Sequence, residues 1–202
     1  MVARLIDKFG IGIALLLEII LFSLLSPYFF TADNLLNVSL QISITSIIAV
    51  GMTFVILTSG IDLSVGSLVA ATGVLATSLL KLNAPLAVAF AAALAAGLLL
   101  GALSGALAGL FITRFHVTPF IVTLALMTIW RGAAFAYTEG RPVWELPDAF
   151  SILGAGRLLE IPIPTIAMAV IFAAAHITLR YTRFGRHVYA VGGMLHAGSR
   201  VC

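Results

Sequence analysis

The chain has 202 residues, of which 61% are apolar and only 9% carry a formal charge. A soluble domain has about 25% charged residues, so this composition excludes both an ordinary water-exposed domain and a disordered segment. The net charge of +3 is not gathered in a basic patch, which excludes a soluble nucleic-acid-binding domain. With one cysteine, Cys202, the sequence has no internal disulfide.

Charged residues divide the sequence into apolar runs. These runs span 19–32, 34–61, 63–80, 82–113, 115–130 and 161–179. A helix needs about 20 apolar residues to cross a bilayer core of about 30 Å. The sequence therefore predicts one all-α membrane domain over residues 1–202, with lipid as its surroundings and no β-sheet. Six crossings are expected near 9–25, 38–58, 64–80, 86–112, 118–138 and 162–180.

The first apolar segment resembles a signal peptide, because Arg4 and Lys8 precede it. However, Glu18 interrupts the apolar run, and Ser26-Pro27-Tyr28 is not a small-x-small cleavage pattern. We therefore expect an uncleaved first helix. Glu18 itself needs either a partner or the headgroup region.

The orientation follows from lysine and arginine, which concentrate on the cytoplasmic side of membrane proteins. Six crossings put one set of positive residues on a single side, which we expect to be the cytoplasm: Arg4, Lys8, Arg114, Arg180, Arg183 and Arg186. Both termini are then cytoplasmic, and the mixed-charge segment 139–160 lies outside.

Four glycines recur at a spacing of four in the fourth run: Gly97, Gly101, Gly105 and Gly109. This spacing places them on one face of a helix, where small residues let two backbones approach closely in lipid. The simpler interpretation is helix packing inside this chain. The alternative is a sliding surface between helices that move.

A second feature is a helix break near 58–64. Gly60 supplies a permissive backbone where one helix ends, and Asp62 can cap the next helix by accepting bonds from its free N–H groups. A broken helix and a carboxylate inside a membrane also mark substrate pathways. A path through the break would involve Thr58, Ser59, Gly60, Asp62 and Ser64.

Arg131 lies near the outer end of the fifth expected helix, next to Trp130. It can extend to the membrane interface, with Trp130 in the aromatic belt, or it can hydrogen-bond a polar substrate. The first interpretation is favoured from sequence alone.

Searches for catalytic and metal motifs find none. Lys8 and Lys81 are the only lysines and neither follows a glycine, so there is no P-loop. The sequence has no Gly-x-Ser-x-Gly elbow and no His-Glu-x-x-His pair, and it indicates no cofactor or metal. An intramembrane enzyme using Asp62 would need a second acid at the same depth, but Asp33 and Asp148 both fall outside. A transporter or channel subunit is favoured over an enzyme.

The segment from Ala49 to Ser67 resembles the signature of ribose-type permeases, the membrane subunits of bacterial ABC importers for simple sugars. Further blocks agree in order over about residues 20–193. They are Ser26 to Thr31, Asn34 to Asn37, Pro119 to Leu124, Arg131-Gly132, Gly154 to Arg157, Ile161 to Pro164 and Thr182 to Gly193.

The resemblance implies a bacterial inner-membrane permease that takes no part in ATP hydrolysis itself. Its partners would be a cytoplasmic ABC ATPase, a second permease copy or homologue, and a periplasmic sugar-binding protein that docks outside, where segment 139–160 could contribute. The loop facing the ATPase would contain Arg183, Phe184, Gly185, Arg186, Gly192 and Gly193.

After Gly193 the sequence departs from the family, because Met194 to Cys202 replaces an expected Asn and Ala-rich stretch. We expect a truncated or frameshifted chain that inserts in the membrane without supporting uptake by itself. A stand-alone carrier or channel remains the alternative, although residues 1–100 and 101–202 show no internal repeat.

Overall fold

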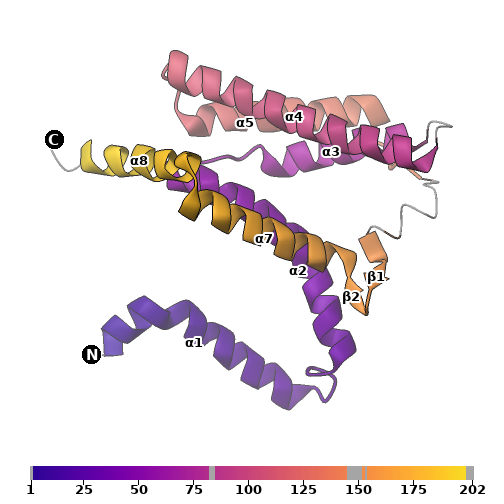
Figure 1. The fold of residues 1–202 in the computed structure, drawn as a ribbon, viewed down its shortest axis with the longest axis vertical. Helices are drawn as coiled ribbons and strands as arrows, with labels where there is room; N and C mark the ends of the chain where they lie inside the picture. Colours follow the sequence, from indigo (N-terminus) through magenta and orange to yellow (C-terminus); the bar gives the residue numbers. More distant parts are fainter. Residues whose placement is uncertain (1, 82–84, 145–151, 153, 199–202) are drawn as a thin grey trace.

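The computed structural model describes residues 2–81, 85–144, 152 and 154–198, and most of them are helical (Figure 1). In chain order the long elements are α1 (Val2–Leu25), α2 (Ala32–Leu57), α3 (Val65–Leu80), α4 (Leu86–Arg114), α5 (Pro119–Thr138), α7 (Ile163–Tyr181) and α8 (Arg183–Gly198). The protein is therefore an all-α polytopic membrane protein, as its apolar runs predict.

Four helices, α2, α4, α5 and α7, are long and apolar enough to cross a membrane. The apolar parts of α1 and α3 are shorter, at Phe9–Leu25 and Val65–Leu80. At about 1.5 Å per residue, the 16 residues of α3 extend about 24 Å, less than the bilayer core. Helix α3 alone is thus too short to span the bilayer core.

Successive helices from α1 to α5, and then α7, run in alternating directions (Figure 1). Helices α2 and α7 are parallel, because Ser39 lies beside Thr165 near their starts and Phe54, near the end of α2, contacts Phe184, which follows α7 at the start of α8. Helices α3, α4 and α5 lie between them in sequence. The start of α1 and the end of α8 lie on the same side of the helix array (Figure 1).

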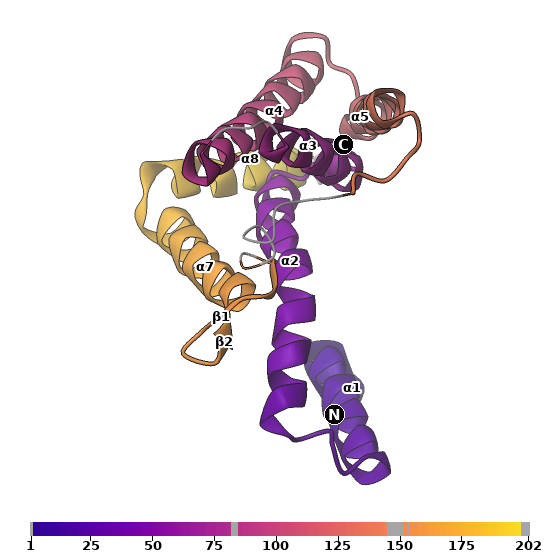
Figure 2. The same ribbon diagram turned by 90° about the vertical axis from the view of Figure 1, so that its right-hand side faces the viewer.

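The described residues form two packed groups. Helices α3, α4 and α5 lie side by side, and α2 packs against α7 and α8, whereas α1 lies apart from the first group (Figures 1 and 2). The few buried apolar side chains of the first group are small or lie between its helices: Ala71, Leu80, Ala89, Ala93, Val122 and Leu126. Most large apolar side chains are exposed, as expected where lipid is the solvent.

A short hairpin precedes α7, so the prediction of no β-sheet is wrong here. Strand β1 (Arg157–Leu158) pairs with β2 (Ile161–Pro162) in antiparallel register. The two turn residues, Leu159 and Glu160, have φ of +50° and +68°. A two-residue hairpin turn of this kind favours Asn and Gly, so Leu-Glu gave no signal for it.

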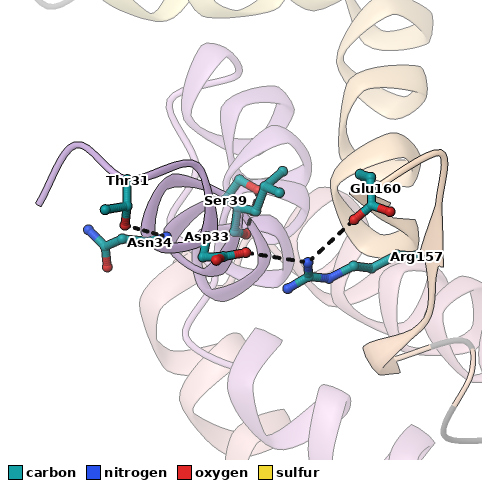
Figure 3. A network of polar contacts seen from close by, with 7 residues as sticks. Thr31, Asp33, Asn34, Ser39, Arg157 and Glu160 are labelled. Atoms are coloured by element: carbon teal, nitrogen blue, oxygen red, sulfur yellow. Dashed lines mark hydrogen bonds and ion pairs between the residues drawn. The ribbon is translucent and has the colours of Figure 1, made fainter. Parts of the chain in front are cut away.

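Polar contacts hold the hairpin beside the start of α2 (Figure 3). The Arg157 guanidinium lies 3.9 Å from the Asp33 carboxylate and 4.0 Å from that of Glu160. Thr31 caps α2 by accepting a 3.4 Å hydrogen bond from the N–H of Asn34. The expected docking segment 139–160 is thus fixed at its end, while its residues 145–151 and 153 lie outside the described residues.

Candidate functional site

The site begins at the C-terminus of α2, which is closed by a tight turn. The N–H of Ser59 donates to the carbonyl of Ile56 (2.9 Å) and that of Gly60 to the carbonyl of Val55 (3.0 Å). Ser59 has φ of +60°, and the Thr58 hydroxyl also donates to the Val55 carbonyl (2.8 Å). This is the Schellman arrangement that ends many helices, here with serine at the left-handed position.

The prediction that Gly60 supplies the unusual backbone conformation is therefore wrong in its detail, because Ser59 holds the positive φ. Gly60 instead occupies a tight position. A Cβ there would lie 3.2 Å from Val55 Cγ1 and 3.3 Å from the Val55 carbonyl oxygen. The break after α2 nevertheless falls where the sequence predicted it.

Residues 60–64 form neither helix nor strand. The Thr123 hydroxyl of α5 donates to the Pro119 carbonyl of its own helix (2.8 Å) and also lies 3.2 Å from the Ile61 carbonyl oxygen. Helix α3 begins only part-way along α4 (Figure 1) and faces the second half of α5. Residues 60–64 and α3 thus lie one after the other along α5.

Backbone without helical hydrogen bonds is tolerated at membrane depth only within protein or beside a water-filled cavity. In the described part of the chain, the N–H groups of Ile61, Asp62 and Leu63 donate no backbone hydrogen bond. These amides are therefore free to bind water or a polar substrate.

Asp62 does not cap α3 in the predicted way. Its Oδ1 accepts from the N–H (2.8 Å) and the hydroxyl (2.6 Å) of Ser64, the residue before the helix. Ser64 is 2% exposed and has helical φ and ψ. Asp62 therefore fixes a local Asx turn that directs the chain into α3, rather than binding amides of its first turn.

A pocket of 370 Å³ opens between the start of α3 and the second half of α5. Its lining is mostly apolar but includes a hydroxyl and a guanidinium: Leu63, Gly66, Ser67, Ala70, Met127, Arg131, Ala134 and Phe135. Such a volume falls in the range of about 300–1,000 Å³ that is usual for small-molecule sites. The break therefore leads directly to a cavity.

Arg131 lines this pocket, and Trp130 points elsewhere. The indole N–H of Trp130 donates to Ser104 Oγ on α4 (2.9 Å), so the ring packs between helices and not in an aromatic belt. This contact removes Trp130 from the predicted aromatic belt, while both interpretations of the exposed Arg131 stay open.

The glycine ladder of α4 has no packing partner among the described residues. A Cβ on Gly97, Gly101, Gly105 or Gly109 would have no neighbouring heavy atom within 4 Å. Gly97 does border a pocket between α3 and α4, where Ala93 is buried. The expected packing of this face inside the chain is thus not found in the part that the structure describes.

The stretch expected to be a loop facing the ATPase is helical, as α8. Gly185 and Gly192 of this helix are buried. A Cβ on Gly192 would overlap the carbonyl oxygen of Leu57, at the end of α2. Phe184 lies against Phe54, with ring centroids 6.3 Å apart. Helix α8 thus touches the last turn of α2, immediately before the break.

The remaining predicted residues of α8 lie differently. Arg183 and Arg186 are exposed, and a Cβ on Gly193 would meet nothing within 4 Å. The contact between Leu57 and Gly192, the Thr123–Ile61 bond and the Ser39–Thr165 pair (3.0 Å) were not predicted. Each joins positions far apart in sequence, so no local pattern could have indicated it.

Comparison with known proteins assigns the chain to a family. Residues 34–196 match the family described as "Branched-chain amino acid transport system / permease component". The chain belongs to this permease family. No solved structure matches it.

Individual permeases of the family give a closer likeness. The chain is 49% identical to the ribose import permease protein RbsC of Escherichia coli (strain K12), over 90% of this chain and 56% of that protein. It is 42% identical to RbsC of Bacillus subtilis (strain 168), over 93% and 58%. It is 36% identical to the L-arabinose ABC transporter permease protein AraH of Azospirillum brasilense, over 94% and 55%. The chain thus spans little more than half the length of these permeases.

Proposed function

We propose that the chain is part of the membrane permease subunit of an ABC importer that carries a simple sugar across a bacterial cytoplasmic membrane. The observation that carries the proposal is the break between α2 and α3, which puts non-helical backbone beside a pocket inside a chain of this permease family. The ribose and arabinose permeases among its relatives favour a monosaccharide over the amino acids in the family description.

The importer would divide the work among several proteins. A partner ATPase would hydrolyse ATP, since the sequence has no P-loop, and a periplasmic binding protein would deliver the sugar to the outer side. A second permease copy or homologue would complete the membrane part. Both ends of the chain would face the cytoplasm, with Arg183 and Arg186 exposed toward the ATPase.

Helix α8 is well placed to couple the ATPase to the break. Gly192 lies directly against the Leu57 carbonyl, two residues before Ser59. A displacement of α8 by the ATPase would therefore reach the end of α2 through a backbone contact, without a flexible side chain between them. The non-helical segment that follows would respond first.

Co-purification tests this proposal. The tagged 202-residue chain, co-expressed with the ATPase subunit of a ribose importer, should retain that ATPase in mild detergent. An unrelated tagged membrane protein of six crossings is the control and should retain none. Equal recovery from both, together with sugar uptake that continues after ATP is exhausted, would point instead to a stand-alone carrier.

The orientation has a separate test. In a Cys202→Ser background, cysteines replacing Glu139 and Arg183 should react with a membrane-impermeant maleimide from opposite sides of the membrane. Position 183 should react only after the cells are opened. Reaction of both from the same side would refute the six-crossing arrangement.

A further inference from the structure

The pocket between α3 and α5 is lined by one charged side chain, that of the exposed Arg131. Arg131 makes no hydrogen bond or ion pair with any residue that the structure describes. It lies 12 residues after the start of α5 and 7 before its end, which is about 18 Å and about 10 Å along the helix. A charged side chain within a membrane helix is costly and commonly marks a substrate or ion path.

The second polar side chain in the pocket offers complementary chemistry. The Ser67 hydroxyl donates its proton to the carbonyl of Ser64 (2.8 Å), so the oxygen presents lone pairs to the pocket. Arg131 has only donors, and its guanidinium carries five N–H groups. The pocket therefore offers donors on α5 opposite an acceptor on α3.

A sugar hydroxyl is both a donor and an acceptor, and it matches this pair. The apolar remainder of the lining, with Phe135 among it, suits the C–H face of a sugar ring. A zwitterionic amino acid fits less well. Its carboxylate could bind Arg131, but no carboxylate lines the pocket to bind its ammonium group.

We propose that this pocket is a sugar-binding subsite on the translocation path, in which Arg131 donates to and Ser67 accepts from hydroxyl groups of the sugar. The assignment rests on the proposed function, and it adds the residues that hold the substrate. The break then has a structural role: ending α2 early places α3 so that Ser67 faces Arg131.

Cysteine protection tests the subsite directly. Ala70→Cys, in a Cys202→Ser background, places a reporter in the pocket, and Thr72→Cys places one on the opposite face of α3, in the α3–α4 pocket. D-ribose should slow maleimide labelling at position 70 in detergent-solubilised protein and leave position 72 unchanged. L-leucine should protect neither position.

Substitutions of the two polar residues sharpen the test. Arg131→Gln should raise the ribose concentration for half-protection by about tenfold, since a charge-assisted hydrogen bond is lost. Ser67→Ala should raise it less, and Arg131→Lys should fall between wild type and Gln. Arg141→Gln, on the connection after α5, is the matched control and should change nothing. Elution as a single species in size-exclusion chromatography shows that each variant is folded.

Three outcomes would overturn the subsite. They are ribose protection that survives Arg131→Gln unchanged, protection by leucine in place of ribose, and no protection by ribose at all. Retention of the ATPase, measured on the same preparation, distinguishes failure of the subsite from failure of the proposed importer function. Absent protection with the ATPase retained rejects the subsite alone, whereas loss of both rejects the importer function as well.

Discussion

The glycines of α8 and those of α4 stand in opposite surroundings, although the sequence suggested a contact for both sets. In α8, Gly185 and Gly192 lie so close to backbone carbonyls that a Cβ has no room. In α4, a Cβ on Gly101 or Gly105 would meet nothing within 4 Å. A glycine pattern therefore identifies a helix face, but only the fold shows whether that face is in contact.

The difference also separates two kinds of structural importance. At Gly192 the small residue is needed within the described chain, because it lets α8 touch the end of α2. On α4 the small residues leave a smooth face with no partner in the described chain. Substitutions at the two places should consequently change the stability of the folded protein in opposite directions. Four experiments test this difference.

The largest effect is expected at the α8–α2 contact. Gly192→Ala should lower stability by about 1–3 kcal/mol, the usual cost of overpacking, because the carbonyl of Leu57 must move away. Gly193→Ala, one residue later and in open space, is the matched control. Thermal unfolding in detergent, followed by tryptophan fluorescence, measures both variants. Equal midpoints would mean that α8 does not touch α2.

The next largest loss of stability is expected at the contact between Thr123 of α5 and Ile61 in the non-helical segment 60–64. Thr123→Val removes a hydroxyl that bonds within α5 to the Pro119 carbonyl and also reaches the Ile61 carbonyl, so it should cost up to about 1 kcal/mol. Thr128→Val is its control, because the Thr128 hydroxyl bonds only within α5, to the carbonyl of Ala125. The same unfolding assay reads both. A loss at Thr128 as large as that at Thr123 would place the non-helical segment away from α5.

A smaller effect is expected at the Asx turn. Asp62→Asn keeps an oxygen that can accept from Ser64, so it should cost less stability than Asp62→Ala, which loses roughly 1 kcal/mol. If both variants unfold alike but neither binds ribose in the protection assay, the carboxylate belongs to the pathway and not to the turn.

The smallest effect is expected on the open face of α4. Gly101→Ala and Gly105→Ala should leave stability unchanged or raise it by up to about 1 kcal/mol, since alanine is the better helix former and has space. A clear loss of stability would instead reveal a helix packed against this face, from a second copy or another subunit. Concentration dependence of that loss would identify a second copy.

Local patterns predicted the helices other than α8, the break and most element boundaries, because each depends on residues close together in sequence. The end of α2 is an example, as Thr58, Ser59 and Gly60 lie within the same turn. The sequence did not predict which residue takes the left-handed conformation, since glycine is favoured there but Ser59 adopts it.

The contacts that make the site were harder to predict. Arg131 meets the α3–α5 pocket, and Leu57 meets Gly192, only after helices distant in sequence pack together. The hairpin before α7 was missed for a local reason, because Leu159 and Glu160 lack the residue types that favour such a turn.

The account depends most on the non-helical backbone of residues 60–64, which we propose to lie within the third crossing, and cysteine scanning of residues 57–64 tests it most directly. Because a maleimide reacts with the thiolate, labelling requires water at the substituted side chain. In membrane vesicles, we expect labelling at every position from 61 to 63, with no period of 3.6, and no labelling at Ile44 on the exposed apolar face of α2. Labelling that follows a helical period through 57–64 would indicate an unbroken helix. Absence of labelling throughout would show that water does not reach this segment, and either result would contradict the account.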